Sequence, residues 1–237
     1  MVSTRPPRRT LIILASSLVV YQNVVTLITG GELFTSGPVA LTISAILIAA
    51  MLLWARQGNL TLVELGITRH GAARGAAIGV GVAAAVAVAA LVLLRSGLLV
   101  PGPVHYAPFA EMTVADVVFR ALVLMPLATI LPEELSFRGV LLGMLRRRYA
   151  DGRAAVLSAI VFAPWHGLIV VHTVGETSLA LSTWGWTLGI VGGFVGVAVG
   201  GWLFAYLRIR TGNLVTSVCC HWAFNASILV GLYALQQ

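Results

Sequence analysis

The sequence has no lysine and little charge of any kind. Charged residues make up 10% of its 237 residues, and all 15 of its basic residues are arginines. Ordinary soluble domains carry about a quarter charged residues, so this composition excludes a typical soluble fold. It places the chain in the membrane class and leaves no room for a large soluble domain.

Cysteine is nearly absent as well. The two cysteines, Cys219 and Cys220, are adjacent and lie inside an apolar run. Such a pair provides neither a disulfide framework nor the CxxC spacing of a metal site. We expect two small apolar side chains buried in the membrane. The HExxH motif of zinc peptidases is also missing.

Long apolar runs fill most of the chain, and 59% of all residues are hydrophobic. A membrane-spanning helix needs about 20 predominantly apolar residues. Seven stretches approach or exceed this length, near residues 10–29, 37–55, 73–94, 113–145, 154–173, 184–207 and 213–235. We predict an all-α polytopic membrane protein with about seven transmembrane helices. The long fourth stretch and the segment at 98–112 leave room for an eighth.

The arginines alternate between loops in a way that predicts topology. Twelve of them lie at the N-terminus or in the second, fourth and sixth connections between spans. Because cytoplasmic loops are rich in arginine and lysine, we predict a multi-pass protein of the plasma membrane with a cytoplasmic N-terminus. We expect the first span to be retained, since it lacks a clear small-residue cleavage site. The arginines lie in short clusters between apolar runs, as topology determinants do, and this placement argues against nucleic-acid binding.

Several polar side chains lie deep inside the predicted spans, where charge is expensive and normally faces a protein interior or a water-filled cavity. Glu133 and His166 each lie about twelve residues, or roughly 18 Å, from the arginine-rich ends of their spans. His221 lies roughly 12 Å from the same side. We therefore expect one polar layer, approached from the arginine-rich, cytoplasmic side.

The spacing of these residues assigns them to helix faces. Glu134 and Arg138 are four residues apart and can pair, while Glu133 is rotated about 100° from Glu134. His221 and Asn225 share one face of the last span. A carboxylate and an imidazole can deprotonate a water, and an imidazole with an amide N–H can stabilise an oxyanion. The pattern favours hydrolysis of an acyl substrate, with a peptide bond as the expected target.

Three motifs, EELSFR, FAPWH and HWAFN, follow one another in apolar segments. They resemble the EExxxR, FxxxH and HxxxN motifs of the CPBP intramembrane proteases. That family includes the type II CAAX prenyl endopeptidases and the Abi-type bacteriocin-immunity proteins. The resemblance covers roughly residues 125–230, and it implies an intramembrane endopeptidase that acts on a membrane-associated protein or peptide in the lipid bilayer.

The resemblance also implies a role for each catalytic candidate. Glu133 would activate the water with the help of His166. His221 and Asn225 would stabilise the oxyanion.

The remaining motif residues would support the site. Glu134 would pair with Arg138 and hold the helix in register, and Phe162 would pack beside His166. Residues 111–237 would form the catalytic helical core. Residues 1–110 would form transmembrane helices whose role the resemblance does not define, so whether the substrate is prenylated stays open.

Two alternatives remain at this point. Glu133, His166 and His221 are also an adequate ligand set for zinc, although the resemblance to glutamate proteases favours a metal-free enzyme without a cofactor. Intramembrane Glu, His and Arg also mark proton relays, so a transporter or a non-catalytic immunity protein is the second alternative.

We expect ordinary roles for the other polar residues. Asp116 and Arg120 are four residues apart and can form a structural pair. His172 falls near a loop and, like the other two histidines outside the motifs, is expected to have no special function. The cluster 146–148 is expected to anchor the topology at anionic lipid.

Overall fold

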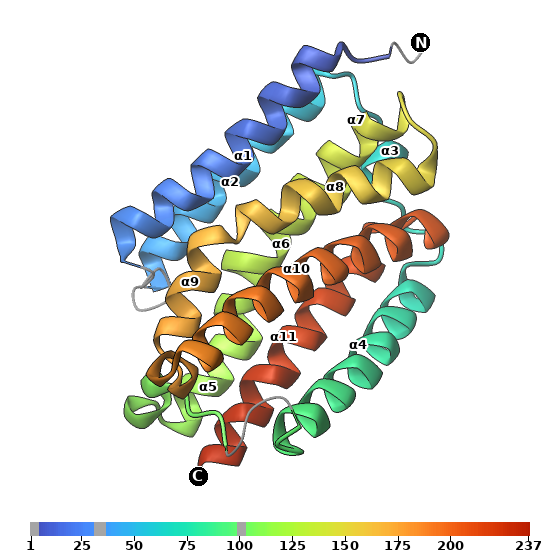
Figure 1. Ribbon diagram of the computed structural model, residues 1–237. Helices are drawn as coiled ribbons and strands as arrows, with labels where there is room; N and C mark the ends of the chain where they lie inside the picture. The colour runs from blue at the N-terminus through green and yellow to red at the C-terminus, as the bar shows by residue number, and fades with distance from the viewer. Residues whose placement is uncertain (1–4, 31–36, 99–102) are drawn as a thin grey trace.

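The computed structural model describes residues 5–30, 37–98 and 103–237, which form a bundle of helices (Figure 1). Six helices are long and apolar enough to cross a membrane: α1 (Arg8–Thr29), α2 (Gly37–Gln57), α4 (Ala72–Arg95), the compound helix Val114–Arg146, α10 (Thr183–Thr211) and α11 (Leu214–Gln236). The pair α8 (Asp151–Trp165) and α9 (Gly167–Gly175), which is bent by 48°, makes a seventh span when it is counted as one broken helix. The predicted all-α polytopic fold is confirmed.

Short elements connect the spans. They are α3 (Leu62–Leu65) and the 3₁₀ helices η1 (Ala107–Glu111) and η4 (Ser178–Leu181). In the described part of the segment 98–112, only η1 begins, so the described residues contain no eighth span. Helix α1 begins and α11 ends at opposite ends of the bundle in Figure 1.

The fourth span is not a regular α-helix. It consists of α5 (Val114–Phe119), η2 (Arg120–Ile130), α6 (Leu131–Glu134), η3 (Leu135–Leu141) and α7 (Leu142–Arg146). The segments η2 and η3 are π-helical. This geometry is rare in proteins, and where it occurs it is often at a functional site. Pro126 and Pro132 lie in this span and each removes a backbone donor. The short segment α6 therefore presents its two glutamates near the middle of the bundle.

The surface of the bundle is apolar over much of its area. Ile12, Leu27 and Val92 are each more than 60% exposed. A bilayer, unlike water, accommodates such side chains because its hydrocarbon core is equally apolar. The chain is thus an integral multi-pass membrane protein.

Helices α4 and α11 lie side by side (Figure 1) and pack through small residues. The buried residues of α4 are Gly75, Gly79, Ala83 and Ala87, spaced four apart. A methyl group on Gly79 would clash with the Thr216 carbonyl oxygen and would lie 2.9 Å from the Cys220 nitrogen. Close backbone approach of this kind is how helices associate in lipid.

The arginine-rich end of the bundle is closed by a docked loop. The Arg147 guanidinium donates to both Glu64 carboxylate oxygens, at 2.7 and 2.8 Å. It also donates to the carbonyls of Gly58 and Asn59, at 2.6 and 2.7 Å. The expectation that this cluster contacts lipid is wrong for Arg147, because its donors are used inside the protein.

The substitution Gly79→Ala should lower the melting temperature in detergent, because overpacking costs about 1–3 kcal/mol. Gly81→Ala is the matched control, since its methyl group would meet nothing within 4 Å. Alanine favours a helix more than glycine does, so this control should melt at or above the wild-type temperature. Equal melting temperatures for Gly79→Ala and Gly81→Ala, measured by scanning fluorimetry, would contradict the packing described for Gly79.

The Glu64–Arg147 contact should make stability depend on pH. The hydrogen bonds from Arg147 lower the pKa of Glu64 from 4.5 to about 2. A carboxyl whose pKa is lowered by folding stabilises the fold fully above the unfolded value and progressively less as the pH falls. Glu64→Gln should therefore melt below wild type at neutral pH, and the difference should vanish as the pH falls from 4.5 towards 2. The exposed carboxylate variant Glu111→Gln is the control and should show no such pH-dependent difference.

Candidate functional site

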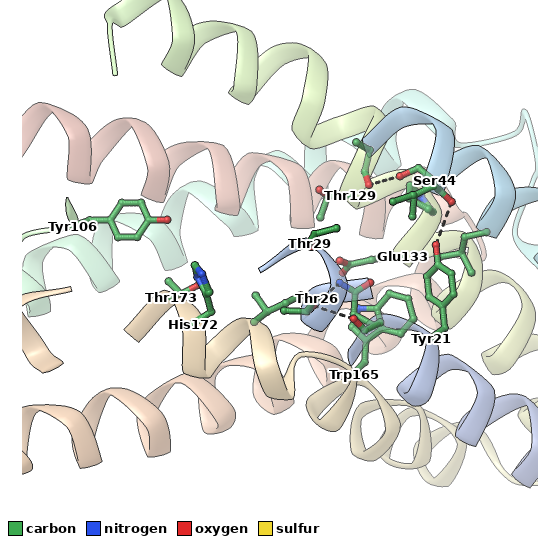
Figure 2. A pocket seen from close by; sticks show the side chains of 16 residues that line it. Tyr21, Thr26, Thr29, Ser44, Tyr106, Thr129, Glu133, Trp165, His172 and Thr173 are labelled. Atoms are coloured by element: carbon green, nitrogen blue, oxygen red, sulfur yellow. Dashed lines mark hydrogen bonds between the residues drawn. The ribbon is translucent and has the colours of Figure 1, made fainter. Parts of the chain in front are cut away.

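Glu133 lies where two cavities meet. The polar chamber is a cavity of about 160 Å³ between α1, α2, α6 and α9, and Figure 2 shows its lining. The apolar chamber, of about 260 Å³, lies on the other side and is lined by Leu124, Met125 and Leu229 among others. Glu133 lines both chambers and is itself 5% exposed.

The partner of Glu133 is His166, as predicted. Glu133 Oε2 lies 3.5 Å from His166 Nε2. The other ring nitrogen, Nδ1, lies 3.0 Å from the Phe162 carbonyl oxygen. A carbonyl only accepts, so Nδ1 carries a proton and donates it to this bond. In the neutral imidazole, Nε2 is then an acceptor that faces the carboxylate.

The bend between α8 and α9 positions His166. Pro164 precedes it within the last turn of α8, and His166 is the residue at which the helix breaks. Asn23 of α1 bridges this break: it donates to the Pro164 carbonyl at 2.9 Å and accepts from the Leu168 N–H at 3.0 Å. Sequence reasoning missed Asn23, because nothing near it in the sequence marks a contact with the fifth span.

The predicted pair of Glu134 and Arg138 is present and fully buried. Arg138 NH1 lies 3.0 Å from Glu134 Oε1, and both side chains are 0% exposed. The contact is an ion pair rather than an aligned hydrogen bond. The same carboxylate oxygen lies 3.0 Å from His221 Nδ1, a contact that the spacing within one helix did not predict. Glu134 therefore orients an imidazole on α11 as well as a guanidinium on its own helix.

Three residues on neighbouring helices complete the surroundings of Arg138. Its guanidinium carbon lies 4.0 Å from the ring centre of Phe162 and 5.1 Å from that of Phe204, which places the cation against two aromatic faces. Its NH2 group donates to the Gly201 carbonyl at 3.1 Å. A side chain on Gly201 would lie 2.8 Å from the Phe162 ring. Gly201 and Phe204 were not predicted.

The two residues expected to stabilise an oxyanion are placed differently. Asn225 lines the apolar chamber together with Glu133 and His166. His221 is 4% exposed, stacks on Phe204 at 4.5 Å and bonds to Glu134. Asn225 thus lies in the apolar chamber with Glu133 and His166. His221 instead contacts Glu134 of the buried ion pair.

The two cavities at Glu133 do not extend towards the arginine-rich end, from which an approach was expected. Every residue from 135 to 145 is buried on that side of Glu133. The polar chamber instead extends to Thr29, Tyr106 and Thr173, near the arginine-poor end. Figure 2 shows Tyr106 and Thr173 at one end of this row of side chains and Glu133 towards the other. Counting residues correctly predicted that Glu133 and His166 lie at one level of the bundle. It could not reveal on which side of Glu133 the helices are closely packed.

His172, expected to be an ordinary histidine near a loop, lies in the last turn of α9 and lines the polar chamber. The expected pairing of Asp116 with Arg120 is wrong. Asp116 does not pair with Arg120 within 4.0 Å in the described structure; it accepts from the N–H and hydroxyl of Thr113 at 2.9 and 2.6 Å and caps α5. Arg120 instead lines the apolar chamber.

A metal centre was considered from the sequence. Within residues 5–30, 37–98 and 103–237, no group of three His, Cys, Asp or Glu side chains is arranged to hold a metal ion. Glu133, His166 and His221, the zinc set considered from the sequence, therefore do not form such a group in this structure.

Comparison with known protein families matches residues 115–227 to the family described as type II CAAX prenyl endopeptidase Rce1-like. That segment is thus similar to this family, which supports the resemblance carried by the three motifs. The match contains all three motifs and excludes α1, α2 and α4. Searches of curated proteins and of solved structures found no match. The family supports an intramembrane protease of the CAAX type in general.

Breaking the buried ion pair should be costly. Arg138→Met leaves the Glu134 carboxylate buried without its cation, which typically costs about 3–5 kcal/mol. The melting temperature in detergent should fall sharply, and the double variant Glu134→Gln/Arg138→Met should recover part of the loss.

The control is Arg146→Met. Its ion pair with Asp151, at 2.7 Å, is 33% and 53% exposed, and exposed pairs contribute about 0–1 kcal/mol. A loss for Arg138→Met no larger than that for Arg146→Met would contradict the structural role of the buried pair.

Proposed function

We propose that the protein is an intramembrane endopeptidase that hydrolyses a peptide bond in a membrane-associated protein or peptide. The observation that carries this proposal is Glu133 Oε2 lying 3.5 Å from His166 Nε2 at the meeting point of two cavities. A carboxylate and an imidazole acceptor this close together can both contact one water that lies beside them. We propose residues 111–237 as the catalytic core, with the N-terminus in the cytoplasm of a plasma-membrane protein.

The reaction begins with proton transfer from the water. Glu133 takes a proton, His166 Nε2 accepts a hydrogen bond from the same water, and the resulting hydroxide attacks the carbonyl carbon of the substrate. Asn225 donates its amide N–H to the oxyanion that forms. Glu133 then returns the proton to the departing amine as the C–N bond breaks. The enzyme is regenerated without a covalent intermediate.

Three other residues support these steps. Glu134 holds His221 through Nδ1, and an additional proton on His221 Nε2 would let this ring donate to the same oxyanion. The nearby Glu134 carboxylate balances the charge of that imidazolium. Arg138 and Phe162 keep the Glu134 and His166 segments in contact.

The direct test is cleavage of a fluorogenic peptide library by the detergent-purified protein. Glu133→Gln should reduce the rate by about 10²–10⁴-fold, the usual contribution of a general base, while Glu111→Gln should cleave at the wild-type rate. Phenanthroline should leave wild-type activity intact. Loss of activity with the chelator and rescue by Zn²⁺ would contradict the metal-free mechanism, and equal rates for wild type and Glu133→Gln would remove Glu133 from the site.

A further inference from the structure

The polar chamber is built in part by helices outside the family match. Helix α1 contributes Tyr21, Gln22 and Thr26, and α2 contributes Ser44. Tyr21 links three helices: its hydroxyl donates to the Ile43 carbonyl at 3.1 Å, and its ring stacks on Trp165 at 5.9 Å. The chamber, at about 160 Å³, has room for roughly ten waters or for a short stretch of extended peptide.

Buried polar atoms around the chamber lack hydrogen-bond partners. Among the described residues these are Thr129 Oγ1, Trp165 Nε1 and Glu133 Oε2, and all three residues line the chamber. Trp165 is 1% exposed. Buried polar groups are nearly always paired in folded proteins. Glu133 Oε2 faces His166 and the proposed catalytic water. The indole donor of Trp165 and the hydroxyl of Thr129, which both donates and accepts, therefore point to a further polar ligand in this cavity.

The chemistry of the lining limits that ligand. Apart from Glu133 and His172, the side chains around the chamber carry hydroxyls, amides or apolar groups and no charge. Such a lining suits an uncharged molecule that both donates and accepts hydrogen bonds, as a peptide main chain does. The adjoining apolar chamber includes five leucine, isoleucine and methionine side chains among its eleven lining residues, and these suit an apolar side chain of the substrate.

The direction of entry follows from the packing. The segment 135–145 is buried on the arginine-rich side of Glu133, whereas the chamber continues to Thr29 and Thr173 at the other end. Thr173 is exposed. Because arginine-rich loops remain in the cytoplasm, this other end lies outside the cytoplasm.

We propose that the polar chamber binds the main chain of the substrate on one side of the scissile bond, and that the substrate enters from the arginine-poor, extracytoplasmic face. This inference rests on the proposed peptidase function. It gives α1 and α2 a part in substrate binding. The preferred substrate is a peptide with an uncharged polar segment next to an apolar residue.

Two adjacent residues of α1 provide a matched test. Thr26 lines the chamber and is 7% exposed, whereas Leu27 is 70% exposed and faces away from the bundle. Thr26→Phe fills the chamber and should lower kcat/KM by at least about tenfold, or about 1.4 kcal/mol. Leu27→Phe should cleave at the wild-type rate. Equal cleavage by the two variants at equal melting temperature would overturn the proposal.

A second variant changes the side-chain volume less and is therefore less prone to misfold than Thr26→Phe. Gln22→Leu removes the amide of a buried chamber residue at similar volume. It should raise KM severalfold and change kcat little, because the substitution is remote from the reacting atoms. An unchanged KM would count against main-chain binding in this chamber. If Glu133→Gln cleaved the peptide as fast as wild type, the proposed function itself would be contradicted.

Entry can be tested without any activity. In a Cys219→Ala/Cys220→Ala background, Thr173→Cys reports on the chamber and Gly152→Cys, which is exposed at the arginine-rich end, serves as the control. A membrane-impermeant maleimide added to intact cells should label Thr173→Cys but should label Gly152→Cys only after permeabilisation. The reverse pattern, or protection of Thr173→Cys in intact cells, would overturn entry from the extracytoplasmic face.

Discussion

The ion pair between Glu134 and Arg138 has no exposed surface, and the rest of the site is arranged around it. Burying two charges is expensive and is sustained only where they are matched and further contacts are made. Here the guanidinium bonds to the Gly201 carbonyl and lies over the Phe162 ring, while the carboxylate holds His221. One pair thus joins the fourth span to α8, α10 and α11. Glu133 is held in place because it is the neighbouring residue.

Local patterns in the sequence were sufficient to predict much of this architecture. Hydrophobic runs of about 20 residues predicted the seven spans, and their ends agree with the structure to within a few residues. The spacing of four residues predicted the Glu134–Arg138 pair. The proximity of Glu133 and His166 was expected because equal depth in a membrane is a strong constraint on two helices.

The rest depends on contacts that no local pattern records. Asn23 bonds to Pro164 and Leu168, which are 141 and 145 residues away. Gly201 matters through its carbonyl oxygen and its missing side chain, neither of which distinguishes it from the other glycines of α10 in the sequence. The direction in which the polar chamber extends from Glu133 depends on the packing of residues 135–145. Depth alone is symmetrical with respect to the two ends of a span and could not predict it.

The central claim is that Glu133 activates a water rather than attacking the substrate itself. The most direct measurement is a single-turnover cleavage in ¹⁸O-labelled water, with excess enzyme and mass analysis of both product and protein. Activation of water predicts that the new carboxylate of the product carries ¹⁸O in the first turnover and that Glu133 stays unlabelled. A first-turnover product with only ¹⁶O, together with ¹⁸O in the Glu133 carboxylate, would show direct attack by Glu133 and contradict the account.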